Sequence, residues 1–294
     1  MTARIIDGKA VADSVRRECR QRAADLTERL GRPAGLAVIM VGEDPASAVY
    51  VRNKIRACDE VGIRSRRLLF PATVPQSEVL DTIATLCADP TVDGILVQLP
   101  LPKSFDLKRV LGAIDADKDV DGFHLYNVGG LVAGNTVFPP CTPYGVMKLL
   151  DHQGIEIAGR NAVVVGASNI VGKPMALMLL QREATVSICH VKTANLAQYT
   201  ILADILVVAA GRPNLILAPM VKSGAVVIDV GINRLPTGKL VGDCDFEGVR
   251  SRASYITPVP GGVGPMTVTM LLVNTLNSAE RALARSLTAT PTSS

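Results

Sequence analysis

The sequence contains no tryptophan and few other aromatic residues, which limits what the protein can bind. Aromatic residues make up 3% of the 294 residues. Proteins that bind nucleic acid strands stack bases on aromatic rings beside a basic groove. The net charge of +4 is small for this length, and the lysines and arginines are dispersed along the chain. We therefore expect no nucleic-acid partner.

Patterns of metal ligands are also missing. The chain has 3 histidines, and its 6 cysteines stand at isolated positions without a C-x-x-C pair. Zinc sites use such closely spaced pairs, so we expect no metal. Scattered cysteines without a partner are typical of reduced, mostly buried thiols in a cytoplasmic protein.

Long apolar runs are absent too. The apolar segment from Ile201 to Ala210 is interrupted by Asp204 and is shorter than the roughly 20 residues that cross a bilayer. The sequence reaches Asp7 before an apolar signal region can form, so we expect no secretory leader and no membrane partner. The expected location is the cytoplasm. The 48% of apolar residues can build one large domain or a pair of ordinary ones.

Apolar strands that alternate with amphipathic helices run through the whole chain. Strands are expected at 36–41, 94–98, 161–166, 185–190, 204–209 and 225–229, and helices at 11–30, 45–61, 76–87, 143–152, 174–180 and 266–287. This alternation indicates an α/β protein with mostly parallel sheets that are covered on both faces. Residues 63–70 show no clear pattern, and the tail 288–294, rich in serine and threonine, is predicted to be disordered.

The segment after residue 140 is typical of a dinucleotide-binding unit. A strand leads into Gly166-x-Ser168-x-x-x-Gly172, and Pro174 opens the next helix. A strand, a glycine turn and a helix N-terminus form an anion site, although this spacing differs from the usual G-x-G-x-x-G. After the second strand of this unit, Lys192 follows His190 and no acid is present. A cation there favours NADP over NAD, whereas His190 is expected to cap the following turn.

A helix that begins at Asp44-Pro45 and stops at Gly62 carries a polar stripe beside its apolar face. Ser47, Tyr50 and Lys54 form this stripe, roughly 100° round from the core stripe. In one interpretation Tyr50 packs at a boundary while Lys54 extends to solvent. In the other, the ring stacks on a flat substrate and a desolvated Lys54 amine transfers protons. The helix alone leaves both open.

Three loops place distinctive residues after the predicted strands. Gln98 ends the strand 94–98 and is followed by Leu-Pro-Leu-Pro102, so it either faces a ligand at the sheet edge or satisfies the turn backbone. The loop 117–122 has 3 carboxylates, and a metal site, a capped turn and a contact to a polar heterocycle all remain open. The loop 257–267 has 3 glycines and 3 prolines and is expected to line a ligand.

Together, these motifs resemble the bifunctional methylenetetrahydrofolate dehydrogenase/cyclohydrolase family. The resemblance rests on Tyr50-x-x-x-Lys54, Val97-Gln-Leu-Pro-Leu-Pro102, Lys118-Asp-Val-Asp-Gly122, Pro140-Cys-Thr-Pro143 and Pro260-Gly-Gly-Val-Gly-Pro-Met-Thr267. It covers almost the whole chain, and its last motif is highly specific. It implies an N-terminal three-layer α/β folate domain at 1–140 with a terminal helix, 266–287, packed back on it. It also implies a Rossmann-type NADP-binding domain at 141–265, a cleft between the domains, and a homodimer.

The resemblance also implies a reaction and a role for each motif residue. The family oxidises 5,10-methylenetetrahydrofolate with NADP+ and hydrolyses the methenyl product to 10-formyltetrahydrofolate. As the catalytic set, Lys54 transfers protons, Tyr50 stacks on the folate, Gln98 hydrogen-bonds Lys54, and Asp121 holds the pterin ring. Further folate contacts are implied for Ser47, Pro260, Gly261 and Gly262, and cofactor contacts for Gly166, Ala167, Ser168, Val191, Lys192 and Ile232.

Two positions of the cofactor motifs depart from the family pattern. Ala167 stands where many relatives have arginine, and Val191 stands where some have serine. Both positions can serve the 2′-phosphate of NADP, so that contact is left to Lys192 or another cation, and use of NAD stays open.

The sequence has two competing interpretations. Tyr-x-x-x-Lys is also the catalytic pair of short-chain dehydrogenases, but there the glycine turn precedes the pair, whereas here Tyr50 precedes Gly166. The other alternative is a folate- or nucleotide-binding protein that has lost its chemistry, and the retention of both Tyr50 and Lys54 argues against it.

Overall fold

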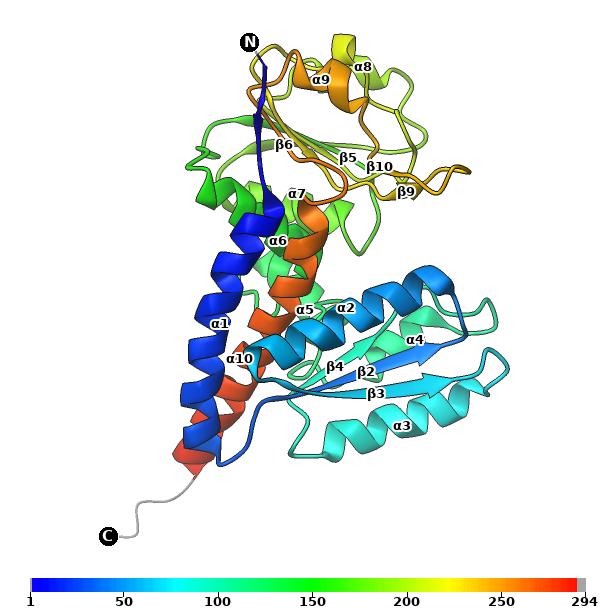
Figure 1. Ribbon diagram of the computed structural model, residues 1–294, viewed down its shortest axis with the longest axis vertical. Coiled ribbons are helices and arrows are strands. Elements are labelled where there is room, and N and C mark those ends of the chain that lie inside the picture. The colour runs from blue at the N-terminus through cyan, green and yellow to red at the C-terminus, as the bar shows by residue number, and fades with distance from the viewer. Residues whose placement is uncertain (1, 290–294) are drawn as a thin grey trace. The chain divides into compact units, whose positions relative to one another are not determined.

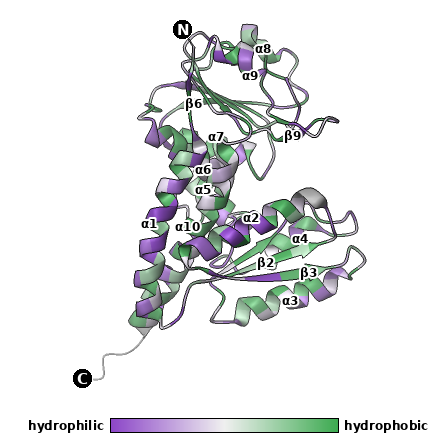
Figure 2. Cartoon of the chain, viewed as in Figure 1, coloured by the Kyte–Doolittle hydropathy of each residue, from purple (hydrophilic) through white to green (hydrophobic). Residues whose placement is uncertain are grey.

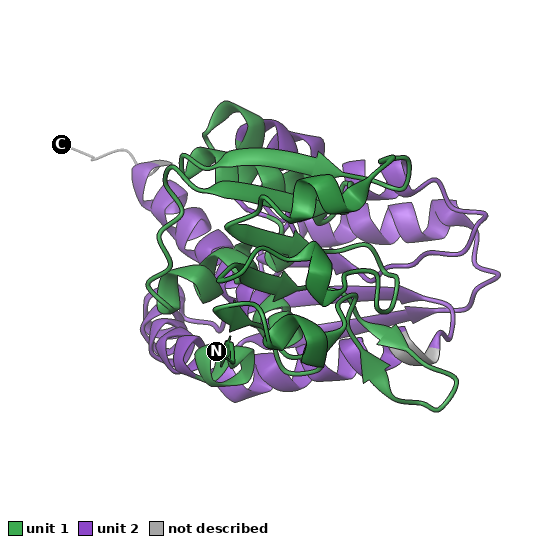
Figure 3. Cartoon of the chain, turned by 90° about the horizontal axis from the view of Figure 1, so that it is seen from above, with its two compact units in different colours: residues 1–13, 131–135, 140–267 green, residues 14–130, 136–139, 268–294 purple. Residues whose placement is uncertain are grey.

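The computed structural model describes residues 2–289, which divide into two compact units (Figure 3). Within the described residues, unit 1 consists of residues 2–13, 131–135 and 140–267, and unit 2 consists of residues 14–130, 136–139 and 268–289. Each unit has its own parallel sheet. The helices α1 (Gly8–Leu30) and α10 (Val263–Ala289) contribute residues to both units. None of the helices that the structure describes is long and apolar enough to cross a membrane.

Unit 2 contains a three-stranded parallel sheet. Its order is β3 (Arg64–Phe70), β2 (Gly35–Val41) and β4 (Gly94–Val97). Its other helices are α2 (Pro45–Val61), α3 (Gln76–Ala88), α4 (Leu107–Gly112) and most of α5 (Leu125–Ala133). The central strand β2 is buried along its length, and Ala37, Ile39 and Val41 pack with residues of α3 and α4. Helix α2 covers the opposite face (Figure 1), which gives the predicted three layers.

The strand β3 was not predicted, because residues 63–70 show no regular pattern. Arg64, Arg66 and Arg67 are exposed on it, and Figure 2 shows hydrophilic residues where β3 begins, whereas β2 is hydrophobic. As an edge strand, β3 pairs only with β2. Charged residues are common on edge strands because they discourage further pairing, so the strand signal here is hidden by the arginines.

Unit 1 contains a six-stranded parallel sheet. Its order is β1 (Arg4–Ile5), β11 (Tyr255–Ile256), β8 (Val226–Asp229), β7 (Ile205–Val208), β5 (Asn161–Val165) and β6 (Thr185–Cys189). The other elements are α6 (Cys141–His152), α7 (Gly172–Gln181), α8 (Leu196–Thr200), the 3-10 turn η1 (Ala218–Met220), α9 (Phe246–Arg250) and an antiparallel hairpin of β9 (Asn233–Arg234) and β10 (Leu240–Val241).

The direction of the strand order in unit 1 reverses at β5. The chain passes from β5 to β6 on one side and then to β7 on the other side of β5. Helices α6 and α7 lie on one face of this sheet, and α8 and α9 lie on the other (Figure 1). In open parallel sheets, ligands bind outside the carboxyl ends of the strands where the order reverses. The fold therefore points to the ends of β5 and β7.

Two of the differences from the sequence prediction concern the predicted folate domain. Strand β1 was not predicted, and it pairs with β11, so residues 4–5 of the predicted folate domain 1–140 lie in the sheet of unit 1. Helix α10 begins at Val263 and extends to Ala289, whereas 266–287 was predicted. Pro265 is tolerated there because the first N–H groups of a helix have no partner within it. Thr288 and Ala289 are helical, and the rest of the predicted tail, 290–294, lies outside the described residues.

Candidate functional site

Helix α2 carries the polar stripe of Ser47, Tyr50 and Lys54, and both of its predicted ends are confirmed. Asp44 Oδ2 accepts the N–H of Ser47 at 2.7 Å, Pro45 occupies the first turn, and Gly62 adopts the left-handed conformation with φ 86°. Such caps fix where the helix starts and stops. They therefore also fix which side chains α2 presents along the stripe.

Lys54 and Gln98 meet at the carboxyl end of β4. Lys54 is 8% exposed, and its Nζ lies 3.0 Å from Oε1 of Gln98. The Nε2 of Gln98 donates to the carbonyl oxygen of Leu99 at 2.7 Å, which leaves the amide oxygen for the lysine. The interpretation in which Lys54 extends to solvent is therefore wrong. Gln98 therefore contacts both the turn backbone and the Lys54 amine.

Ser47 and Tyr50 flank the same contact. Ser47 is 5% exposed, and its Oγ lies 3.5 Å from the carbonyl oxygen of Leu99. Tyr50 is half-buried, and burial raises the pKa of its phenol above the ordinary value of 10.0. The hydroxyl group of Tyr50 is therefore protonated at neutral pH and can donate a hydrogen bond.

Asp121 lies in a turn that follows a contact with β4. Ile95 of β4 forms an isolated parallel bridge with Asp119, and the N–H of Gly122 then donates to the carbonyl oxygen of Asp119 at 3.2 Å, which closes the turn. Asp121 is partly exposed. Of the residues predicted for catalysis, the structure brings Lys54 and Gln98 into direct contact.

The carboxylates of the loop 117–122 have different surroundings. Asp117 accepts a hydrogen bond from Arg285 Nη2 at 2.8 Å. Asp119 is 1% exposed and accepts from Asn127 Nδ2 at 2.8 Å, and burial raises the pKa of Asp119. The loop therefore does not join its acids into a metal site. Across residues 2–289, no group of 3 or more His, Cys, Asp or Glu side chains is placed to hold a metal ion.

The glycine turn of unit 1 has the close approaches that a phosphate site needs. A Cβ added to Gly166 would lie 2.2 Å from the carbonyl oxygen of Ala209, and one added to Gly172 would lie 2.0 Å from that of Gly166. Ser168 Oγ accepts the N–H of Val171 at 3.1 Å and so fixes the turn before α7. Only glycine fits at these two positions. Together with Ala167, this turn fits dinucleotide phosphates at a helix N-terminus.

The predicted contacts beyond the turn are exposed side chains. Val191 is 96% exposed and Ile232 is 45% exposed, and Lys192 is also exposed. His190 Nδ1 accepts the N–H of Lys192 at 3.1 Å, which confirms that His190 caps the turn after β6. Lys192 is thereby presented at the carboxyl end of an edge strand, where a 2′-phosphate can be bound.

The loop that contains Pro260, Gly261 and Gly262 lies in unit 1, whereas Lys54 and the rest of the predicted catalytic set lie in unit 2. The N–H of Lys9 donates to the carbonyl oxygen of Gly261 at 3.1 Å, and Gly261 has φ 105°. The start of α1 therefore fixes the shape of this loop within unit 1.

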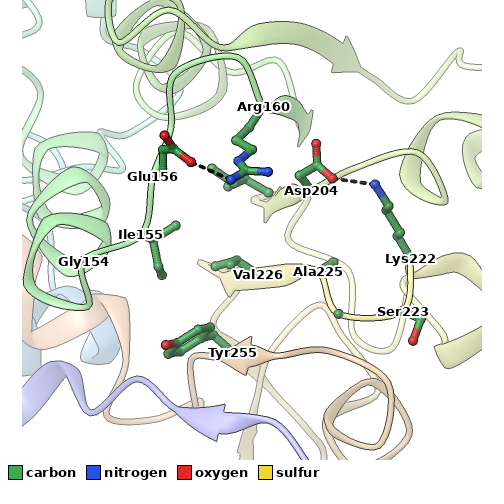
Figure 4. A pocket seen from close by; sticks show the side chains of 12 residues that line it. Gly154, Ile155, Glu156, Arg160, Asp204, Lys222, Ser223, Ala225, Val226 and Tyr255 are labelled. Atoms are coloured by element: carbon green, nitrogen blue, oxygen red, sulfur yellow. Dashed lines mark hydrogen bonds and ion pairs between the residues drawn. The ribbon is translucent and has the colours of Figure 1, made fainter.

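A cavity of about 260 Å³ opens at the amino-terminal ends of β7, β8 and β11 (Figure 4). Arg160 is paired with Glu156, and Lys222 is paired with Asp204. The cavity lies at the opposite edge of the sheet from Gly166, and its charged side chains neutralise one another. We therefore assign it no part in cofactor binding.

Sequence analysis missed two buried carboxylates of unit 1, Asp229 and Asp243, which are 3% and 0% exposed. Burial raises the pKa of Asp229 to about 6, although backbone N–H groups oppose this rise. The position of Asp229 at the end of a predicted strand was an available signal. Asp243 follows only the short strand β10, and no comparable sequence signal marks it.

Comparison with known proteins assigns the family. Residues 6–121 match the profile described as tetrahydrofolate dehydrogenase/cyclohydrolase, catalytic domain, and residues 140–283 match its NAD(P)-binding domain. The chain belongs to this family. It is 62% identical to a bifunctional FolD protein of Nitrosospira multiformis, over 97% of this chain and 99% of the relative.

Solved structures of the tetrahydrofolate dehydrogenase/cyclohydrolase family have the same fold. A bifunctional FolD enzyme of Campylobacter jejuni aligns with a TM-score of 0.93 at 52% identity, covering 95% of this chain and 99% of that one. A Trypanosoma brucei enzyme, complexed with NADP cofactor and an inhibitor, aligns with a TM-score of 0.92 at 40% identity, covering 96% and 98%. The chain is thus a methylenetetrahydrofolate dehydrogenase and cyclohydrolase of one-carbon folate metabolism, which excludes the short-chain dehydrogenase alternative.

Proposed function

We propose that Lys54 transfers the protons of the cyclohydrolase step and that Gln98 holds its amine in place. The observation that carries this proposal is the burial of Lys54 with its Nζ 3.0 Å from the amide oxygen of Gln98. The amine is thus enclosed by protein and faces a neutral hydrogen-bond acceptor. An amide, unlike a carboxylate, adds no negative charge that would keep the proton on the amine.

The hydrolysis needs a group that first accepts and then donates a proton. A water oxygen bonds to the methenyl carbon of the cationic folate while the neutral Lys54 amine takes one proton from the water. The protonated amine then returns a proton to the ring nitrogen as its bond to that carbon breaks. The remaining hydroxyl proton leaves to solvent as the carbonyl of 10-formyltetrahydrofolate forms.

The oxidation step depends on orientation rather than on proton transfer. NADP+, when bound in unit 1, would supply the acceptor for the hydride of the methylene carbon. The product is a stabilised cation, so no acid is needed, and the protein contributes by holding the reactants in place. We assign this positioning to Tyr50, whose half-buried ring can stack on the folate.

We assign the binding of the pterin ring to Asp121. A carboxylate can accept hydrogen bonds from the ring amino group and a ring N–H together, and Asp121 is a partly exposed residue of the turn that follows the bridge between Asp119 and Ile95 of β4. Ser47 is assigned as a weaker folate contact. Pro260, Gly261 and Gly262 are assigned to the folate by their motif.

We propose NADP as the cofactor of unit 1. Its assigned contacts are Gly166, Ala167, Ser168, Val191, Lys192 and Ile232. The close approaches at the glycine turn fit the phosphates, and the exposed Lys192 supplies a cation for the 2′-phosphate. We further propose that unit 2 binds tetrahydrofolate derivatives, and that the protein acts in the cytoplasm as a homodimer.

The wild-type protein tests this function directly. Purified protein is mixed with 5,10-methylenetetrahydrofolate and either NADP+ or NAD+, and the absorbance of the methenyl product is followed. We expect the absorbance to rise and then decay, faster with NADP+ than with NAD+. Preformed methenyltetrahydrofolate is expected to decay without any dinucleotide. No absorbance rise with either dinucleotide would refute the dehydrogenase assignment.

Replacing Lys192 with glutamine is expected to raise the KM for NADP+ about tenfold and leave the KM for NAD+ unchanged. The variant loses one charge-assisted contact to the 2′-phosphate, which only NADP+ carries. The matched control is Lys222→Gln, which removes another lysine of unit 1 at the opposite edge of the sheet (Figure 4). An equal change for both dinucleotides would mean that Lys192 does not bind the 2′-phosphate.

A further inference from the structure

The loop after β7 is held by a carboxylate of the same unit. Asp243 Oδ2 accepts the N–H groups of Ala210 at 2.6 Å and Gly211 at 2.9 Å, and its Oδ1 accepts that of Arg212 at 2.8 Å. Asn233 Nδ2 also donates to Oδ1, at 2.8 Å. Successive backbone N–H groups of this kind form a concave anion site. Here the protein fills that site with its own carboxylate.

A second carboxylate, that of Asp229, holds Asp243 in turn. Asp229 Oδ1 accepts the N–H of Asp243 at 2.9 Å and that of Gly231 at 3.0 Å, and Oδ2 accepts that of Cys244 at 2.8 Å. A Cβ on Gly231 would lie 2.2 Å from Asp243 Oδ1, and one on Gly242 would lie 1.9 Å from Asp229 Oδ2. The two carboxylates therefore pack directly against backbone and connect the loops that follow β7 and β8.

The loop that Asp243 holds borders the glycine turn. A Cβ on Gly166 would lie only 2.2 Å from the carbonyl oxygen of Ala209, and the N–H of Ala209 donates to the carbonyl oxygen of Val165 at 2.7 Å. This is the point between β5 and β7 where the strand order reverses and where ligands bind in such sheets. The loop is therefore part of the wall of the dinucleotide site.

We propose that Asp243, held by Asp229, is a positioning residue for the dinucleotide of the dehydrogenase step. It fixes the backbone of residues 210–212 before the cofactor binds, so that binding does not have to order this loop. The inference rests on the proposed function, because it requires unit 1 to bind NADP+. The cyclohydrolase reaction uses Lys54 of unit 2 and no dinucleotide, and it therefore serves as an internal reference.

The test is Asp243→Asn. Four N–H donors converge on the two oxygens of Asp243, so an amide group, which has a single oxygen, leaves buried donors without an acceptor. We expect the KM and the Kd for NADP+ to rise at least about tenfold, while kcat/KM for hydrolysis of methenyltetrahydrofolate stays within about twofold of wild type.

The matched control is Asp204→Asn. Asp204 precedes the same strand β7 at its other end, where its Oδ2 accepts the N–H of Asn161 at 2.9 Å and its Oδ1 pairs with Lys222 (Figure 4). This variant also removes a carboxylate that binds backbone, but away from the glycine turn. Its melting temperature is expected to fall while its Kd for NADP+ is unchanged. A Kd for NADP+ that is unchanged in Asp243→Asn, or cyclohydrolase activity that falls in parallel, would overturn the inference.

A second pair of variants covers the case in which Asp243→Asn does not fold. Gly211 and Gly224 have φ 64° and 81°, and a Cβ at either would meet nothing within 4 Å. Alanine therefore strains the backbone of each turn without a clash. Gly211→Ala is expected to raise the KM for NADP+ and spare hydrolysis, and Gly224→Ala, at the opposite edge, is expected to change neither. Equal effects of the two variants would overturn the inference. Absent oxidation by wild type would instead refute the proposed function.

Discussion

Replacing Lys54 with methionine is expected to lower the cyclohydrolase rate by about 10²- to 10⁴-fold, the usual contribution of a general acid–base group. Methionine is similar in length and apolar, so it fills the space of a residue that is 8% exposed without leaving a cavity. The variant therefore removes the proton-transferring amine while it keeps the packing of α2. The measurement is the decay of methenyltetrahydrofolate absorbance without a dinucleotide.

Oxidation of methylenetetrahydrofolate is expected to persist in Lys54→Met. Departure of the hydride leaves a cation that requires no proton donor, so the loss of the amine changes substrate orientation and not the bond chemistry. With hydrolysis blocked, the methenyl product is expected to accumulate where wild type consumes it. Lys54→Met is thus expected to lose the cyclohydrolase activity and to keep the dehydrogenase activity.

Two further variants test whether hydrolysis requires proton transfer by Lys54 or only a positive charge at this position. Lys54→Arg keeps a positive charge that cannot be removed at any working pH, so it is expected to lose hydrolysis as well. Lys108→Met removes an exposed lysine of the same unit and is expected to behave like wild type. Hydrolysis by Lys54→Met or Lys54→Arg at a wild-type rate would exclude Lys54 as the proton carrier.

The partner of the Lys54 amine is the neutral amide of Gln98 and not a carboxylate. A carboxylate at the same 3.0 Å from Nζ would stabilise the ammonium form through a full opposite charge. The amide oxygen accepts a hydrogen bond from the amine in either protonation state. The bond from Nε2 to the carbonyl oxygen of Leu99 keeps that oxygen facing the lysine. In the proposed mechanism, Gln98 orients the amine without adding a negative charge beside it.

The helix α2 was predictable because its signals are local. Asp44, Pro45 and Gly62 act within one turn of the residues they cap, and the spacing of Tyr50 and Lys54 follows from helix geometry alone. The burial of Lys54 was not predictable. It depends on Gln98, which lies 44 residues away in the sequence, and single-sequence patterns carry no information about such contacts.

The difference between local signals and contacts that are distant in the sequence also explains why the surroundings of the acids in the loop 117–122 could not be predicted. Its acids look equivalent in the sequence, yet Asp117 is paired with Arg285 of α10, which lies 168 residues further along the chain, and Asp119 is buried against Asn127. Lys118 Nζ adds hydrogen bonds to backbone carbonyl oxygens at the C-terminal end of α3. Family motifs could single out Asp121, whereas charge and spacing could not.

Replacing Asp121 with alanine is expected to raise the dissociation constant for folate substrates about 10²- to 10⁴-fold. Hydrogen bonds to a charged group contribute about 1.5–3 kcal/mol each, and loss of a pair of them corresponds to roughly that change in affinity. The effect falls on binding because the assigned contacts are to the pterin ring and not to the reacting carbon. Isothermal titration with 5-formyltetrahydrofolate, which does not react, measures the constant directly.

The matched control for Asp121→Ala is Asp117→Ala, which removes another carboxylate from the same loop. Asp117 is paired with Arg285 and Arg281, and its pKa is held below the ordinary value by the hydrogen bond from Arg285. We expect this control to lower the melting temperature at neutral pH and to leave the folate dissociation constant unchanged. If both variants weaken folate equally, the loop acts through its shape. If Asp121→Ala binds folate like wild type, Asp121 does not hold the pterin.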